Sequence, residues 1–309
     1  WCAHRELNVT IRMVLIEGRQ NSMLTALITG TSTGIGRATA LRLARDGLRV
    51  WASMRDTSMG ASLEEIASAE HLDLKVVQLD VEDQPSVDDA FSQIGAVDIL
   101  VNNAGLSPVG SVEEFDLSDW KQLFETNVFG LIRCTQAALP SMRANGSGRI
   151  INISSVAGRV AIPMFGPYSS TKWAVEAISE SLASEAAIFG IQVTLIEPGA
   201  VATPIREKTG VPKRESPYRP VAKNWGFSVG YDHAHPSEPE EVAAAISEVI
   251  TNPSPPLRVT VGSDVDQMID LRDRHNDEHW LELWSSETGD FLKRWQSLTG
   301  IDLTELPGR

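Results

Sequence analysis

From residue 24 onward, short apolar runs alternate with longer stretches of helical pattern, and this alternation constrains the fold more than any other feature. Strands are predicted at 24–29, 48–53, 74–79, 97–102, 148–153, 192–197 and 257–261. Helices are predicted at Ile35–Asp46, Pro85–Ile94, Ser118–Arg143, Gly166–Phe189 and Glu238–Thr251. Most strand runs are continuously apolar, which is typical of strands covered on both faces. The pattern predicts one α/β domain with a doubly wound, seven-stranded parallel sheet and helices on both faces.

Charge and cysteine content exclude several classes of function. The chain holds 27 Lys and Arg against 41 Asp and Glu, a formal net charge of -14. Because nucleic-acid phosphates bind clustered cations, DNA and RNA are not expected partners. No apolar run is long enough to span a membrane, so no membrane partner is expected. Two cysteines are too few for a disulfide framework, and a cytoplasmic location is predicted.

The first 22 residues do not fit the alternating pattern. Their apolar run Val14–Ile16 is too short for a secretory signal and is flanked by charges. We expect residues 1–22 to be a disordered extension, or sequence upstream of a start at Met23. The domain is then predicted to occupy residues 23–309.

A glycine-rich turn joins the first predicted strand to the first predicted helix. It places Gly30, Gly34 and Gly36 within Thr29–Gly36. Glycine permits positive φ and lets a pyrophosphate approach the backbone, and the helix N-terminus behind it offers free N–H groups. In this strand–turn–helix context, the turn favours a phosphate site over a plain tight turn.

The turn is one of several motifs that together resemble the short-chain dehydrogenase/reductase family. The others are Asn102–Gly105, Asn127, Ser155, Tyr168–Lys172 and Pro198–Gly199, in the family's order and spacing. The resemblance covers roughly residues 24–205 and is greatest to hydroxysteroid and retinol dehydrogenase-like members. It implies a Rossmann-type fold and hydride transfer between a nicotinamide cofactor and the carbonyl or alcohol of a small, apolar substrate. It also implies a homodimer or homotetramer that packs through helices 118–143 and 166–189.

Tyr168 and Lys172 are separated by one helical turn, so the ammonium can lie near the phenol. A phenol of pKa ~10 exchanges protons poorly at neutral pH, and a nearby cation should lower this pKa. The resemblance implies that Tyr168 is the general acid/base and that Lys172 tunes it and holds the nicotinamide ribose. Ser155 is implied to orient the substrate oxygen, with Ser154 as its rival. Asn127 is implied to hold a water that relays protons to the lysine.

The end of the second strand bears on the choice of cofactor. Dinucleotide-binding folds that use NAD usually place an acid there for the ribose 2′-hydroxyl. This chain has Met54 at that position and then Arg55, whose guanidinium could clamp a 2′-phosphate. NADP(H) is therefore predicted over NAD(H), although Asp56 could serve the ribose instead.

The full set of expected cofactor contacts combines the turn, the strand ends and the resemblance. It comprises Gly30, Thr31, Ser32, Thr33, Gly34, Ile35, Gly36, Arg55, Asp80, Val81, Asn102, Ala104, Gly105, Tyr168, Lys172, Pro198, Gly199, Val201 and Thr203.

Residues of about 204–236 are rich in proline and aromatic side chains and are predicted to form a loop. The resemblance implies that this loop covers the substrate. Its aromatic residues would suit an apolar ligand, but they could equally pack the loop onto the core. His233 and His235 lack an acidic partner at ligand spacing, so no metal site is expected.

The C-terminal tail, about residues 263–309, has tryptophans at 280, 284 and 295 among charged residues. This pattern predicts an amphipathic terminal helix. Such a helix could close the pocket or form an oligomer interface.

Two other classes of function remain open. One is a non-catalytic protein that senses NADP(H), although all four implied catalytic side chains are present. The other is a different enzyme on the same scaffold, such as an epimerase or a 3-oxoacyl-carrier-protein-type reductase. An epimerase usually needs a larger C-terminal region than this chain shows. A carrier-protein enzyme needs a basic docking patch, which Lys208, Lys213, Arg214 and Arg219 could form.

Overall fold

The computed structural model describes residues 23–206, 215–262 and 265–304, so the predicted extension 1–22 lies outside the described residues. Seven parallel strands form one sheet in the order β3-β2-β1-β4-β5-β6-β7. They are β1 (Thr25–Ile28), β2 (Arg49–Met54), β3 (Leu74–Gln78), β4 (Ile99–Asn102), β5 (Gly148–Ile153), β6 (Ile191–Pro198) and β7 (Arg258–Val261). The predicted doubly wound α/β fold is confirmed.

Helices alternate with these strands and then continue beyond them. They are α2 (Gly34–Arg45), α3 (Ala61–Glu70), α4 (Gln84–Ile94), α5 (Leu117–Phe124), α6 (Gly130–Asn145), α7 (Gly166–Ala187), α8 (Arg219–Ala234), α9 (Pro239–Thr251), α10 (Val265–Asp273), α11 (Asp277–Ser285) and α12 (Thr288–Thr299). Short helical segments are η1 (Thr57–Gly60), η2 (Glu125–Phe129), η3 (Val156–Gly158) and η4 (Pro204–Arg206). The single helix predicted at 118–143 is two α-helices joined by the π-helical η2.

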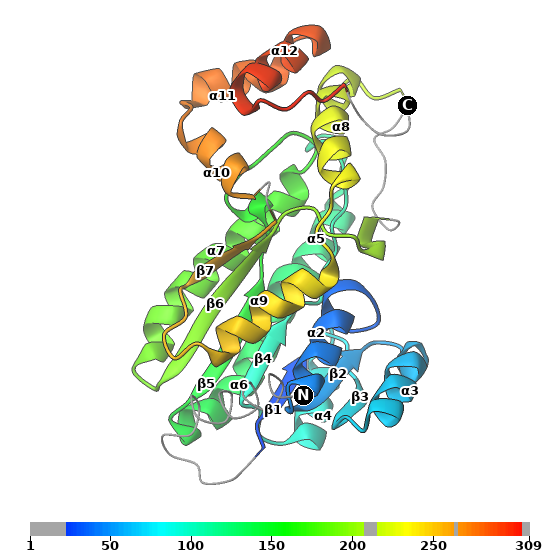
Figure 1. The fold of residues 1–309 in the computed structure, drawn as a ribbon, viewed down its shortest axis with the longest axis vertical. Helices are drawn as coiled ribbons and strands as arrows, with labels where there is room; N and C mark the ends of the chain where they lie inside the picture. Colours follow the sequence, from blue (N-terminus) through cyan, green and yellow to red (C-terminus); the bar gives the residue numbers. More distant parts are fainter. Residues whose placement is uncertain (1–22, 207–214, 263–264, 305–309) are drawn as a thin grey trace.

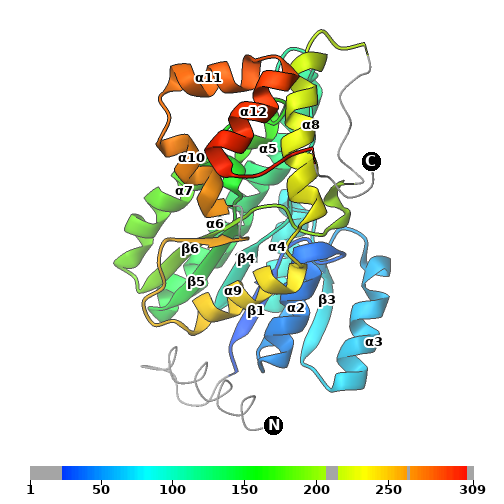
Figure 2. The ribbon, with the colours of Figure 1, turned by 45° about the horizontal axis from the view of Figure 1, so that its top comes forward.

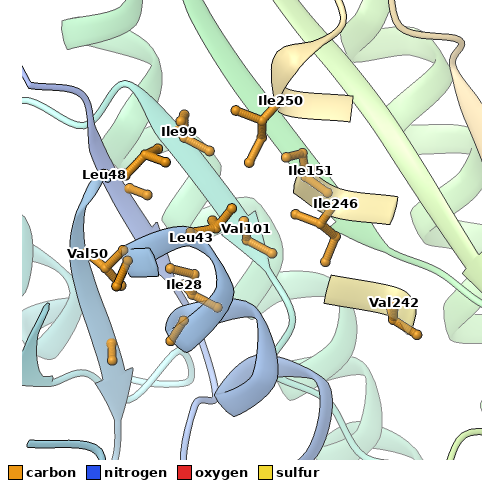
Figure 3. Packing of buried hydrophobic residues seen from close by; sticks show 14 of the residues in the cluster. Ile28, Leu43, Leu48, Val50, Ile99, Val101, Ile151, Val242, Ile246 and Ile250 are labelled. Atoms are coloured by element: carbon orange, nitrogen blue, oxygen red, sulfur yellow. The ribbon is translucent and has the colours of Figure 1, made fainter. Parts of the chain in front are cut away.

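Both faces of the sheet are covered, as the continuous apolar runs predicted. Ala26 and Ile28 of β1 belong to a cluster with α2, α3 and α9, whereas Leu27 points to a second cluster with α4, α6 and α7. In Figure 3, Ile28 of β1 lies beside α2, whereas Val101 and Ile151 lie toward Ile246 of α9. Each such fully buried aliphatic side chain contributes about 1.5–3 kcal/mol relative to exposure.

The last helices form a cap, which we define as α8 and α10–α12. These helices gather at one end of the sheet, apart from α2 and α9, which lie along its face (Figures 1 and 2). The cap has an apolar cluster of its own, built around Phe227, Trp280, Trp284, Phe291 and Trp295. Among the described residues, no helix is long and apolar enough to cross a membrane.

Two predictions about this region are wrong. Within the predicted loop 204–236, residues 219–234 form helix α8, and the described part of the tail forms three helices rather than one. Pro220 reads as a helix breaker, yet it occupies the first turn of α8, where its missing N–H costs no helical hydrogen bond. The tail divides because α11 begins anew at the cap residue Asn276, whose side chain accepts from the His279 N–H.

Candidate active site

A cavity of about 590 Å³ lies where the carboxyl ends of the strands meet the cap. Its wall includes residues that follow β1, β2, β3, β4, β5 and β6, and side chains from α7, α8 and α10. β1 has β2 on one side and β4 on the other, so the strand order reverses there. Open α/β sheets bind ligands outside their carboxyl ends at such a reversal.

The glycine-rich turn forms one end of the cavity, and its backbone fits a phosphate group. Gly30 and Gly34 have φ of +72° and +58°, and a Cβ at Gly30 would lie 2.8 Å from the Ala104 Cα. Thr33 is the N-cap of α2 but makes no side-chain capping bond, which leaves first-turn N–H groups for an anion. The Asn103 amide holds the turn in place, since it donates to the carbonyls of Thr29 (2.8 Å) and Gly30 (3.0 Å).

The end of β2 supplies the neighbouring wall. Met54 and Arg55 both line the cavity. Asp56 instead caps η1, where its carboxylate accepts from the N–H and the hydroxyl of Ser58 at 3.0 and 2.7 Å. The carboxylate that could have served a ribose is therefore engaged with the backbone of η1.

Ser155, Tyr168 and Lys172 converge on the same cavity. Ser155 caps η3 directly after β5, and its hydroxyl makes a hydrogen bond with the Tyr168 hydroxyl. Lys172 is buried on α7, and its Nζ donates to the Ile153 carbonyl at 2.8 Å. This Nζ lies 5.7 Å from the centre of the Tyr168 ring. The strand end and the helix together bring a hydroxyl, a phenol and an ammonium into one place.

The protonation of these groups differs from expectation. Burial raises the pKa of Tyr168 to about 12, and the hydrogen bond with Ser155 offsets only part of this rise. Desolvation therefore dominates the pKa of Tyr168, and the expectation that Lys172 tunes this phenol stays a prediction. Burial also lowers the pKa of Lys172 to about 8, against the opposing charge of Glu176. At neutral pH the site holds a phenol and an ammonium.

Asn127 is buried and does not line the cavity. It lies in η2, a π-helical segment of the kind often found at functional sites. Its Nδ2 donates to the Leu106 carbonyl at 2.9 Å and to the Thr171 hydroxyl at 3.0 Å, while its Oδ1 accepts from the Leu106 N–H at 2.8 Å. Asn127 thus joins the loop after β4 to the helix that carries Tyr168 and Lys172.

Most of the predicted site residues line this one cavity. They are Gly30, Ser32, Thr33, Gly34, Ile35, Arg55, Asp80, Val81, Ala104, Gly105, Ser155, Tyr168, Lys172, Pro198, Gly199, Val201 and Thr203. Ser154, the rival to Ser155, lines it as well.

Three predicted cofactor residues, like Asn127, lie behind the cavity wall. Thr31 is fully buried and its hydroxyl donates to the Ser53 carbonyl at 3.0 Å. Gly36 is buried in the first turn of α2. Asn102 donates to Asn152 Oδ1 (2.9 Å) and Thr135 Oγ1 (3.1 Å), so it stabilises the sheet interior. In these four cases the motif identifies the segment but not the side chain that faces the cavity.

One part of the cavity wall is apolar, and sequence reasoning missed most of it. Its wall includes Val109, Val160, Ile162, Phe165, Ile205, Trp225, Val229 and Met268, with Asp232 among them. The aromatic content of 204–236 was a signal for Trp225. No sequence pattern indicated Met268, because it reaches the cavity only through the packing of α10 in the cap.

No cluster that could hold a metal ion occurs among the residues that the structure describes. The His235 Nδ1 lies 3.2 Å from the Tyr231 carbonyl, and the side chain of His233 is outside the described part.

The fold and the site define a Rossmann-type dinucleotide-binding protein with a Ser–Tyr–Lys constellation at the carboxyl edge of its sheet. Residues 24–213 match the short chain dehydrogenase family, and the chain belongs to it. Human retinol dehydrogenase 8 is 38% identical over 76% of this chain and 80% of its own length. Rat estradiol 17-beta-dehydrogenase 1 is 36% identical over 75% of this chain and 72% of its own. The crystal structure of a short-chain dehydrogenase from Streptomyces avermitilis has a TM-score of 0.72 at 33% identity, over 91% of this chain and 99% of that one.

Proposed function

We propose that this oxidoreductase uses NADP(H) to interconvert a carbonyl and an alcohol on a small, apolar substrate. One observation carries the proposal. Ser155, Tyr168 and Lys172 converge at a cavity whose other end is a glycine-rich turn with a free helix N-terminus. The first group can move a proton at an oxygen atom, and the second can bind a dinucleotide phosphate.

Arg55 supports the choice of NADP(H). It lines the cavity at the end of β2, the position where these folds meet the ribose of the adenosine. A guanidinium pairs with phosphate through two parallel hydrogen bonds, whereas the neighbouring carboxylate of Asp56 is held by Ser58. The pyrophosphate would lie against Gly30–Gly36, and Lys172 would hold the nicotinamide ribose.

The bound cofactor would supply a hydride to the carbonyl carbon of the substrate. The Ser155 and Tyr168 hydroxyls would hold the carbonyl oxygen, and Tyr168 would give its proton to that oxygen as the alkoxide develops. A phenol of pKa about 12 is protonated at neutral pH, and this favours the reductive direction. Lys172, as an ammonium, would stabilise the phenolate and return a proton to it. The water relay implied for Asn127 stays a prediction, since that side chain binds Leu106 and Thr171.

We base the substrate class on the apolar part of the cavity wall. Side chains such as Val160, Phe165 and Met268 offer apolar contact over most of that surface. Transfer of apolar surface from water into such a wall contributes roughly 25 cal/mol for each Å² buried. We therefore expect a carbonyl or alcohol on an apolar body rather than a sugar or a small hydroxy acid.

Oxidation of NADPH with a panel of steroid, retinoid, aliphatic and acyl-thioester ketones tests this proposal. We expect turnover of at least one apolar ketone, and tighter binding of NADPH than of NADH in a fluorescence titration. Turnover of the acyl thioester alone would favour the carrier-protein reductase. Binding of NADPH without turnover of any substrate would favour the sensing protein.

We also propose a homodimer or homotetramer that packs through α5–α7. Leu117, Phe129 and Trp173 on these helices are exposed apolar side chains, as expected of an unpaired interface. Light scattering after size exclusion would report the mass of the assembly, and a monomer at micromolar concentration would contradict it. The cytoplasmic location stays a prediction.

A further inference from the structure

Four side chains follow one another at successive turns of α7. Tyr168 and Lys172 belong to the proposed active site, and Glu176 and Glu180 continue the row at the same spacing of four residues. Only 7% of the Glu176 side chain is exposed, against 64% of Glu180. A buried carboxylate one turn from the cavity is costly unless it is held by a partner.

Arg258 of β7 is that partner. Its Nε donates to Glu176 Oε2 at 2.8 Å and lies 3.4 Å from Oε1 of Glu197, while its Nη2 donates to Glu180 at 2.7 Å. Glu197 of β6 is fully buried and also lies 3.5 Å from the Arg159 guanidinium. Burial and the charge of Glu176 raise the pKa of Glu197 to about 7.

We call Arg159, Glu176, Glu180, Glu197 and Arg258 the ionic group. It is attached to the segments that carry Ser155, Tyr168 and Lys172. Glu176 shares α7 with Lys172, Arg159 directly follows η3, which Ser155 caps, and Glu197 immediately precedes Pro198 of the cavity wall. Gly158 of η3 lies against α7 so closely that a Cβ there would be 3.1 Å from Glu176 Cγ and 3.2 Å from the Lys172 carbonyl.

We propose that Glu176 is a positioning residue, fixed by Arg258, that keeps Lys172 charged in the active site. The inference deepens the proposed function and rests on it. Lys172 and Glu176 make no direct ion pair, so the carboxylate acts across the turn of the helix through the low dielectric of the interior.

The charge balance around Lys172 is consistent with this role. The ionisable groups nearby are the half-buried Tyr168 and the buried Glu176 on α7, and the buried Glu197 on β6. The partly exposed Arg159 and Arg258 neutralise these carboxylates. The charged side chains of α5, Asp119 and Lys121, are exposed and screened by solvent. Burial lowers the pKa of Lys172 to about 8, and Glu176 raises it. Removal of the Glu176 charge should therefore let Lys172 lose its proton at lower pH.

The test is the pH dependence of kcat/KM for a ketone from the panel, at saturating NADPH. The wild type should lose activity as Lys172 deprotonates, well below the range in which Tyr168 titrates. Glu176→Gln should shift this alkaline limb to lower pH by about half a pH unit or more. Glu176→Met removes the same charge with an apolar chain and should shift it likewise, should the Gln variant fail to fold.

Two variants separate charge from shape. Glu176→Asp keeps the charge but shortens the side chain, so its alkaline limb should coincide with that of the wild type. Glu180→Gln removes an exposed carboxylate from the same arginine and should not move the limb. If the role of Glu176 were only structural, the pattern would be the opposite: Glu176→Asp would lower kcat/KM, and Glu176→Gln would leave the pH profile unchanged.

The outcomes distinguish this inference from the proposed function. Absence of turnover by the wild type with every substrate overturns the proposed function. Turnover with coincident pH profiles for the wild type, Glu176→Gln and Glu176→Met overturns this inference alone. A wild-type profile without an alkaline limb between pH 7 and 10 also overturns it.

Discussion

The sheet edge and the cap build the two halves of one cavity by different physical means. At the sheet edge, directional contacts fix the polar groups, as with Lys172 on the Ile153 carbonyl at 2.8 Å. In the cap, aromatic rings pack: the Trp284 ring lies 5.3 Å from Phe291 and 5.7 Å from Trp295. Hydrogen bonds position atoms closely, whereas apolar packing tolerates repacking at similar volume. The comparison teaches that the polar groups of the cavity and its cap side are held in place by different kinds of contact.

The two halves meet just after Ser155. Val160 lines the cavity and also belongs to the cap cluster, and the Trp280 indole N–H donates to the Ala161 carbonyl at 3.3 Å. If the halves are separable, substitutions at the sheet edge should change turnover or cofactor binding. Substitutions in the cap should change only the binding and selection of the substrate.

Loss of the Tyr168 hydroxyl should have the largest effect. Tyr168→Phe keeps the ring and removes the proton donor, so kcat should fall roughly 100- to 10,000-fold. NADPH affinity, measured by fluorescence titration, should stay within twofold of the wild type. Tyr218→Phe is the matched control, since the Tyr218 hydroxyl binds Glu113 outside the cavity, and it should be silent. Full activity of Tyr168→Phe would refute the assignment.

Truncation of a cap tryptophan should come next. Trp284 is buried in the centre of the cap cluster, and Trp284→Ala should destabilise the cap by about 3–5 kcal/mol. Amide hydrogen exchange should then speed up in α11 and α12 and not in β4 or β5, and KM for the ketone should rise. Leu281→Ala, on the same helix but 67% exposed, should change neither. Equal loss of NADPH affinity in Trp284→Ala would show that the halves are not separable.

Removal of the Arg55 guanidinium should weaken NADPH selectively. A charge-assisted hydrogen bond contributes about 1.5–3 kcal/mol, so Arg55→Gln should raise the Kd for NADPH about 10- to 100-fold. The Kd for NADH should barely change. Arg45→Gln makes the same change in net charge on α2, where Arg45 binds Glu70, and should leave both constants unchanged. A parallel loss of both cofactors would argue against a 2′-phosphate site at Arg55.

The smallest effect is expected at Met268. This side chain comes from α10 and lines the apolar part of the cavity wall, so Met268→Ala should enlarge the cavity there. The ratio of kcat/KM for a bulky ketone to that for a small one should rise a few-fold, up to about tenfold. Met59→Ala, at an exposed methionine, serves as the control. An unchanged ratio would remove Met268 from the specificity wall.

Local sequence predicted the segments at the sheet edge well, because each structural feature there depends on a few neighbouring residues. The glycine turn, the spacing of Tyr168 and Lys172, and the position of Ser155 after a strand all depend on short-range geometry. Where the same motifs failed, as at Thr31 and Asn102, the side chain points away from the cavity. A motif identifies a segment, but the direction of each side chain in that segment depends on what packs behind it.

The cap could not be predicted in this way. Pro220 and the aromatic residues around α8 led to the prediction of a loop. Helix α8 is stabilised by packing into the cap cluster, and its own sequence has little helical periodicity that would have predicted it. Met268 could not be predicted from local sequence either, because it is distant in the chain from the other residues of the site.

By itself, the sequence determined the parallel α/β sheet, the glycine-rich turn and the positions of the residues that we propose for proton transfer, because periodicity and short spacing encode them. Only the tertiary structure decided which side chains face the cavity, how the cap covers it, and how the site is protonated. The last point is physical: proximity of Lys172 predicted an acidic Tyr168, but the desolvation that raises its pKa to about 12 exists only once the chain around it has folded.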